Sequence, residues 1–248
     1  MAIIGLIMGV IAIFGAFLIE GGKIGALMVI PALMIVFIGT AAAAMIGTPR
    51  EIFFKFPVFM KLALFPPSVN VTSTIEIIVD LSTVARREGI LSLEEKAKTI
   101  EHPFFKKMIM LAVDGIEPEV IKDIAENEIN YISERHNANA ALFQKMGGYS
   151  PTMGIIGTVL GLISTLANAG GDANELVKSI ATAFIATLWG VFMANIVWLP
   201  IGDRLKAVHN EEKILLEIIV EGVASIQSGE NPTVTKMKLY SMLPGSFQ

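Results

Sequence analysis

The feature that most constrains this 248-residue chain is a set of four windows that contain no charged residue and no histidine. They span residues 1–19, 24–49, 146–171 and 179–202. About 20 apolar residues in a helix cross the hydrocarbon core of a bilayer, which is about 30 Å thick. Because each window is long enough to cross that core or nearly so, the sequence predicts an all-α membrane protein with four transmembrane helices.

The same windows limit the chemistry of the protein. Ionisable groups inside a membrane usually mark ion pathways, and these windows contain none. If ions cross the membrane here, the carboxylate that binds them must come from another chain. The chain has no cysteine, and we find no nucleophile motif and no phosphate-binding loop. We therefore predict no enzyme, no catalytic residue, no metal site and no cofactor.

The remaining charges point to the same class of protein. A net charge of −4 gives no sign of nucleic-acid binding. The three histidines, His102, His136 and His209, are far apart in the sequence and lack the spacing of metal ligands. We expect them on the surface.

The basic residues predict the orientation in the membrane. Residues 50–145 carry 12 Lys and Arg and residues 203–248 carry 5, whereas Lys23 and Lys178 stand alone in the two short connections. Basic residues concentrate on the cytoplasmic side of a membrane, so both large polar segments should be cytoplasmic, with both termini on that side. The first window has neither the basic start nor the cleavage site of a signal peptide, and we expect it to be retained.

The chain then divides into four parts. Residues 1–49 form a transmembrane hairpin (helices 1 and 2), and 50–145 form a helical cytoplasmic domain. Residues 146–202 form transmembrane helices 3 and 4, and 203–248 form a cytoplasmic C-terminal helix and tail. Within the second part, Ser92 and Glu95 have the spacing of a capping box that opens a helix. Residues 229–248 show little pattern.

Small residues follow one face of each of the last two predicted transmembrane helices. The third helix has Gly154, Gly157 and Gly161, and the fourth has Ala183, Ala186, Thr187, Gly190 and Ala194. The simpler interpretation is close helix packing, and we also expect these faces to carry contacts between copies of the chain.

Two threonines and two prolines lie in the same helices. Thr158 and Thr187 could bond to their own helix backbone or could line an ion path. Pro151 and Pro200 lie near the cytoplasmic helix ends. Each alone indicates a bend, whereas a pair at matching depth suggests a hinge.

A dense group of charges surrounds Gly89. It consists of Arg86, Arg87, Glu88, Glu94 and Glu95. One interpretation is a solvated turn, since Arg suits the end of a helix and Glu the start of the next. The alternative is an electrostatic docking face for a cytoplasmic partner.

Several stretches together resemble a known family, the flagellar stator subunits of the MotA/PomA type. They are GALMVIPALMIVFIGT at 25–40, ARREGILSLE at 85–94, GTVLGL at 157–162 and TLWGVFMAN at 187–195, followed by Pro200. Each motif alone is weak, but they occur in the family's order and the similarity extends over residues 2–227.

The resemblance implies a motor subunit of the bacterial inner membrane. In this family five copies surround two copies of a MotB/PomB-type partner, which has a single membrane helix, supplies the membrane aspartate and binds peptidoglycan. Ion flow turns the pentamer, which pushes on the rotor switch protein FliG. By motif match, Arg86 and Glu94 take the places of rotor-contacting charges, and we include their neighbours Arg87 and Glu95. Pro151 and Pro200 match the prolines of conformational coupling.

The resemblance also bears on the transported ion. Thr158 and Thr187 match threonines of sodium-driven members, whereas Ala186 departs from an adjacent threonine of those members. We therefore favour Na⁺ over H⁺.

Three alternatives to a flagellar stator subunit remain. The first is an ExbB/TolQ-like motor subunit, against which the hairpin at 2–46 argues. The others are a secondary transporter, which would usually need charged or unwound membrane helices, and a structural scaffold.

Overall fold

The computed structural model describes residues 1–167 and 173–243, and the side chains of these residues except 173–175. The end of the third window and the last five residues lie outside the described part. The described elements are all helical. They group into two compact units, unit 1 with Met1–Pro66 and His136–Lys206, and unit 2 with Pro67–Arg135 and the chain from Ala207 onward.

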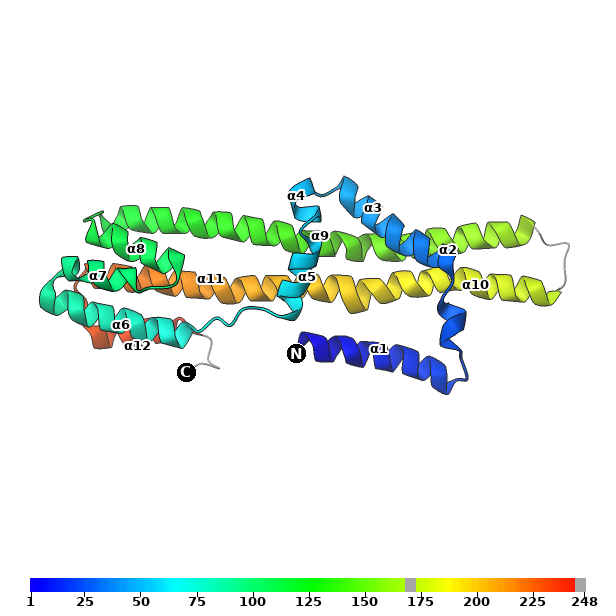
Figure 1. Cartoon of the computed structure of the whole chain (residues 1–248), viewed down its shortest axis with the longest axis horizontal. Coiled ribbons are helices and arrows are strands. Elements are labelled where there is room, and N and C mark those ends of the chain that lie inside the picture. Colours follow the sequence, from blue (N-terminus) through cyan, green and yellow to red (C-terminus); the bar gives the residue numbers. More distant parts are fainter. Residues whose placement is uncertain (168–172, 244–248) are drawn as a thin grey trace. The chain divides into compact units, whose positions relative to one another are not determined.

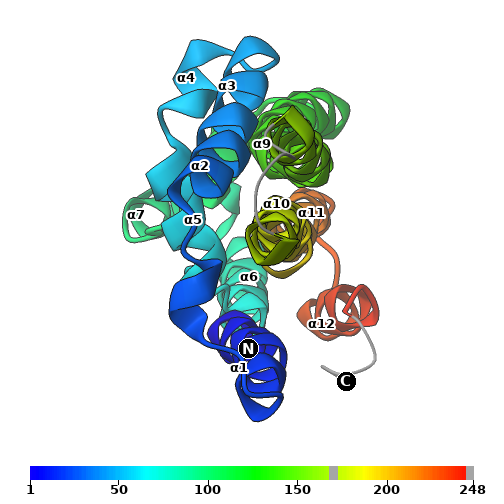
Figure 2. The ribbon, with the colours of Figure 1, turned by 90° about the vertical axis from the view of Figure 1, so that its right-hand side faces the viewer.

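Unit 1 contains the apolar helices. They are α1 (Ala2–Ile19), η1 (Ile24–Leu27), α2 (Ile30–Leu33), η2 (Met34–Ile38), α3 (Gly39–Ile46), α4 (Arg50–Phe53), α5 (Phe56–Leu64), the second part of α9 (Pro118–Ala167), α10 (Ala173–Phe192), η4 (Met193–Trp198) and the start of α11 (Leu199–Gln227). Here η1 is a 3₁₀ turn, and η2 and η4 are π-helical segments. Figures 1 and 2 both show α9 and α10 lying side by side.

Three helical stretches are long and apolar enough to cross a membrane. They are Ala2–Ile19, Pro118–Ala167 and Leu176–Gln227. The second charge-free window gives a shorter apolar helix, Ile30–Ile46. It is shortened because Ile24–Leu27 forms a separate 3₁₀ turn and Pro31 occupies the first turn of the following helix. Proline is tolerated there, since the first N–H groups of a helix have no partner within the helix.

Trp189 joins three of the apolar segments. Its indole N–H donates to the carbonyl of Leu27 over 2.9 Å, which fixes the 3₁₀ turn against α10. Its ring lies 5.8 Å from that of Phe14 in α1, and 6.3 Å from that of Phe37 in η2, between ring centres. Such aromatic pairs contribute beyond the area that they bury. Trp189 of the fourth window therefore contacts both halves of the N-terminal hairpin.

Unit 2 is a small helical domain with its own core. It contains α6 (Val71–Glu88), η3 (Ile90–Ser92), α7 (Leu93–Lys98), α8 (Pro103–Val113), the first part of α9, most of α11 and α12 (Pro232–Ser241). The fully buried side chains include Ile75, Ile78, Phe105, Met108, Ile218 and Ile219. Gly222 of α11 has no room for a Cβ, which would lie 2.7 Å from Ile78 of α6.

Two sequence expectations about unit 2 are wrong. Ser92 does not cap α7, because its own backbone is helical and its hydroxyl donates to the carbonyl of Gly89 over 2.6 Å. The tail is not without structure either: Asn231 caps α12 by accepting from the N–H of Thr233, and Leu239 of this helix is fully buried. The tail escaped detection because α12 buries few residues and leaves Val234 and Met237 exposed.

Candidate functional site

The small residues of α9 and α10 pack against each other within one chain. A Cβ on Gly154 would lie 2.7 Å from the carbonyl oxygen of Ala186, and one on Gly157 would lie 2.6 Å from the Ala186 methyl. At the next turn a Cβ on Gly161 would lie 2.8 Å from the Ala183 methyl. The helix-packing interpretation is therefore correct. Contacts between copies of the chain on these faces stay a prediction.

This close approach brings Thr158 and Thr187 into direct contact. Their hydroxyl oxygens lie 2.6 Å apart. Thr158 Oγ1 is also 3.0 Å from the carbonyl oxygen of Ala183 and 3.2 Å from that of Gly154. Thr187 Oγ1 lies 3.4 Å from the same Gly154 carbonyl. Four oxygen atoms from two helices thus converge, and we call Thr158 Oγ1, Thr187 Oγ1 and the carbonyls of Gly154 and Ala183 the oxygen cluster.

The two hydroxyl protons of the oxygen cluster can form two of its four oxygen–oxygen contacts as hydrogen bonds at a time. If the Thr187 hydroxyl donates to Thr158, the Thr158 hydroxyl is free to donate to the Ala183 carbonyl, which is its nearer carbonyl partner. Both hydroxyls are part-buried in helices that carry no charge at this level. The cluster offers oxygen atoms alone, which are the ligands that hard cations prefer.

The third residue predicted for the ion pathway contributes differently. Ala186 is 1% exposed and its methyl group fills the space beside Gly157. It has no hydroxyl, so it adds packing to the site and no side-chain oxygen.

Pro200 follows a local change in helix type. A proline lacks its N–H and its ring collides with the carbonyl four residues earlier, which here is that of Ile196. The chain forms the π-helical segment η4 (Met193–Trp198) at this point, and its wider turn accommodates the ring. The sequence indicated a bend at Pro200, and the π-helical segment is its structural form.

Pro151 lies inside the long helix α9. Its missing N–H leaves the carbonyl of Gly147 without its helical donor. Gly147 packs against Leu199, the residue before Pro200, since a Cβ there would lie 2.4 Å from Leu199 Cδ2. Ser150, next to Pro151, packs instead against Gly190. The two prolines therefore do not lie at matching depth, and Pro200 is level with the turn before Pro151.

The charged group at 86–95 forms the end of α6 and the start of α7. Gly89 makes the turn with φ +85°, a conformation that glycine adopts at little cost. Arg86 and Arg87 are exposed and make no ion pair with any residue that the structure describes, whereas Lys98 lies 3.9 Å from Glu94 and 2.6 Å from Glu95. The hydrogen bond from Lys98 to Glu95 raises the pKa of the Lys98 ammonium.

The ion pairs of Lys98 support the solvated-turn interpretation for the acidic residues but not for the two arginines. The acids are accounted for by Lys98 and by their place in the first turn of α7. Arg86 and Arg87 lie in the last turn of α6, where positive charge is favourable, but their guanidinium groups bind nothing in the described chain. They remain available to a partner.

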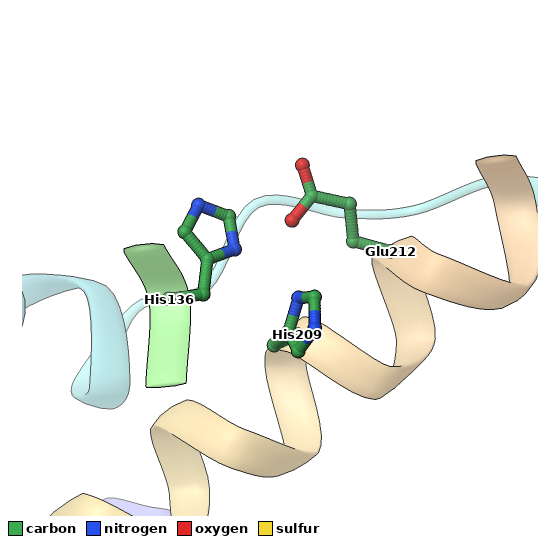
Figure 3. A group of neighbouring side chains, drawn as sticks. All are labelled: His136, His209 and Glu212. Atoms are coloured by element: carbon green, nitrogen blue, oxygen red, sulfur yellow. The ribbon is translucent and has the colours of Figure 1, made fainter. Parts of the chain in front are cut away.

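The histidines differ from expectation. His209 is buried, at 5% exposed, and His102 accepts the N–H of Phe105 as the cap of α8. Figure 3 shows that His209 and Glu212 come from the same helix, α11, and His136 from α9. His136 belongs to unit 1 and the other two to unit 2, so we assign no ligand site to this group.

Sequence reasoning missed two parts of the site. The carbonyl of Gly154 could have been found, because a helical threonine often donates to the carbonyl four residues before it. The carbonyl of Ala183 could not, since it comes from a different helix. Trp189 was quoted as part of a motif, but its role as the anchor of the 3₁₀ turn follows from the structure alone.

Comparison with known proteins covers nearly the whole chain. Residues 3–89 match the family described as Motility protein A N-terminal, and residues 96–218 match the MotA/TolQ/ExbB proton channel family. The first match favours the motility branch over the TolQ and ExbB branches.

Individual relatives agree with the family matches. The chain is 34% identical to Motility protein A of Bacillus subtilis over 98% of this chain and 90% of that protein. It is 31% identical to the chemotaxis protein PomA of Vibrio alginolyticus over 97% and 94%. The solved flagellar MotAB stator complex from Bacillus subtilis contains a chain that matches with a TM-score of 0.92 at 33% identity, over 98% of this chain and 96% of that one.

These matches cover both the apolar helices and the charged unit between them. They make this a multi-pass helical membrane protein with the role of a channel-family motor subunit rather than of an enzyme. The chain belongs to the MotA/PomA family of flagellar stator subunits.

Proposed function

We propose that several copies of this chain, five by family resemblance, surround a MotB/PomB-type partner and couple ion flow across the inner membrane to rotation. The observation that carries this is the oxygen cluster in helices without charge. It can hold a cation only when a carboxylate from another chain adds the negative charge. The solved Bacillus subtilis relative bears the printed description of a MotAB complex, which supports a partner of the MotB type.

The proposed topology has four spans with both termini in the cytoplasm. The helix Ile30–Ile46 is the shortest of the four, with 17 residues. At 1.5 Å per residue it extends about 25 Å, somewhat less than the hydrocarbon core. The 3₁₀ turn at Ile24–Leu27, which Trp189 holds, supplies the remaining apolar residues. The distribution of basic residues supports the orientation.

Torque transfer is assigned to the charged turn of unit 2. Arg86 and Arg87 are exposed and without ion pairs in the described chain, and Glu94 and Glu95 lie directly after the same turn. Opposite charges on FliG would steer and orient the contact. Leu93 of α7 is fully buried in the unit 2 core and fixes the start of this helix.

Sodium is the proposed coupling ion. A sodium ion that loses part of its hydration shell needs oxygen ligands, and Thr158 and Thr187 supply two within 2.6 Å of each other. Pro151 and Pro200 lie on the cytoplasmic side of this cluster and are proposed to carry its conformational change toward unit 2. The freed carbonyl of Gly147 and the π-helical segment before Pro200 are the places where these helices can change shape most easily.

Complementation tests the proposed function. The chain and its cognate partner are expressed in a strain without stator genes, and rotation of single tethered motors is measured. We expect stepwise gains in speed as stator units join the rotor. The control is the same pair with the partner's membrane carboxylate replaced by its amide, which should assemble without rotation. Assembled complexes that give neither rotation nor ion current would contradict the proposal.

A further inference from the structure

Unit 1 has a groove between α2, α9 and α10 that adjoins the oxygen cluster and shares Ala183 with it. Its volume is about 630 Å³, within the roughly 300–1,000 Å³ range of ligand sites. Small residues, among them Gly157 and Ala186, form one wall of the groove. The groove therefore runs along the helices beside the oxygen cluster, and its own lining decides what can occupy it.

The lining changes from apolar to polar along the groove. Pro31, Ile35 and Leu160 line the part nearer the centre of the helices. Lys178, Ser179 and Thr182 line the part at the beginning of α10. Lys178 is the one ionisable side chain among the described residues of the lining. The groove thus has a cationic end and an apolar end, in the order in which a membrane changes from headgroup to hydrocarbon.

The polar end of the groove offers few hydrogen-bond donors to a ligand. The hydroxyls of Thr165 and Thr182 already donate to carbonyls of their own helices, at 2.8 and 2.9 Å. The Lys178 ammonium has three N–H donors on a flexible apolar stem, and Ser179 adds a hydroxyl beside it. An anion with several oxygen atoms, such as a phosphate group, matches this end, whereas a metal cation would be repelled by Lys178.

We propose that this groove binds one anionic phospholipid, with its phosphate at Lys178 and an acyl chain along Pro31, Ile35 and Leu160. In the proposed orientation the polar end faces the outer leaflet, and this assignment of the leaflet rests on the proposed function. Basic pockets between membrane helices bind phospholipid headgroups by the same chemistry. The bound acyl chain covers the glycine face of α9 from the side and limits access of other lipid to the oxygen cluster.

Lipid retention by the purified complex tests this proposal. The chain is purified with its partner in mild detergent, titrated with phosphatidylglycerol or with phosphatidylcholine of the same acyl chains, and examined by native mass spectrometry. We expect phosphatidylglycerol to be retained with roughly tenfold higher affinity by wild type than by Lys178→Gln, because one charge-assisted contact is lost. Lys23→Gln is the matched control, since Lys23 lies in the other short connection and does not line the groove.

A second pair of variants tests the apolar end. Leu160→Trp should fill the groove and reduce retention of both lipids, whereas Ile163→Trp, one turn further along α9 and 58% exposed, lies outside the lining and should not. Equal retention by wild type, Lys178→Gln and Leu160→Trp would overturn the lipid site. So would loss of ion current in Leu160→Trp with unchanged lipid retention, since the groove would then serve the ion or the partner. Lipid retention is measured without rotation, so it can fail or succeed independently of the stator function.

Discussion

The hydroxyl oxygens of Thr158 and Thr187 lie 2.6 Å apart across the interface of α9 and α10. This contact depends on the absence of side chains at Gly154 and Gly157, because any Cβ there would collide with Ala186. Helix packing and the proposed ion site therefore share one interface. A change that separates the helices should also separate the oxygen atoms.

Glycine substitutions should reveal this dependence. Gly154→Ala and Gly190→Ala place a Cβ 2.7 and 2.6 Å from backbone carbonyl oxygens, which cannot move aside as a side-chain end can. We expect each to lower the free energy of unfolding by about 1–3 kcal/mol, measured as a lower thermal midpoint of the purified complex. Gly148→Ala is the control, because nothing lies within 4 Å of its Cβ position. Equal midpoints for all three variants would show that the helices are not in this contact.

The C-terminal helix α12 should be an integral part of unit 2. Leu239 is fully buried, and its replacement by alanine should cost about 2–5 kcal/mol because a core cavity is left. Met237 on the same helix is 70% exposed, and Met237→Ala should change little. Limited proteolysis of the cytoplasmic region distinguishes the two. Similar cleavage rates for both variants would mean that α12 is not held in the core.

The helix order could be predicted because the bilayer excludes charge. The windows at 1–19 and 179–202 lie in helices of membrane length. A charged residue inside a bilayer costs free energy, so a long window without charge marks a membrane-spanning helix. The second window predicted a helix that is too long. No charge marks the 3₁₀ turn at Ile24–Leu27, and Trp189, which holds this turn, is far away in the sequence. Distant partners of this kind are not visible in local patterns.

The sequence indicated which residues belong to the candidate site but not how they are arranged. The sequence named Thr158 and Thr187 as a pair of hydroxyls in apolar helices, and the structure brings them into contact, while their role in an ion path stays a prediction. Their mutual contact within one chain depends on how far α9 and α10 slide along each other, which the packing of Gly154 against Ala186 sets. The capping role given to Ser92 failed for a similar reason, since Gly89 turns the chain and directs that hydroxyl backward.

Charge reversal in the turn of unit 2 should weaken torque with little effect on the fold. Arg86→Glu removes a positive charge that has no ion pair in the described chain, so unit 2 should lose only the contribution of a charge at the end of α6, about 0.3–1 kcal/mol. We expect slower rotation at high load, partly restored by a compensating reversal on FliG. Lys122→Glu on α9 is the control, because its ion pair with Glu126 is long, at 3.8 Å, and exposed. Normal torque in Arg86→Glu, Arg87→Glu and Glu94→Lys would remove the docking assignment.

Swimming speed against external sodium at fixed pH tests the central claim most directly. Cells whose only stators contain this chain and its partner should reach a speed that saturates with sodium. Thr158→Val keeps the shape and removes an oxygen, and should raise the half-saturating sodium concentration about tenfold, equivalent to about 1.4 kcal/mol. Thr152→Val, whose hydroxyl bonds only to Tyr149 in its own helix, should behave as wild type. Unchanged wild-type speed in sodium-free medium, or a Thr158→Val curve that coincides with wild type, would contradict the account.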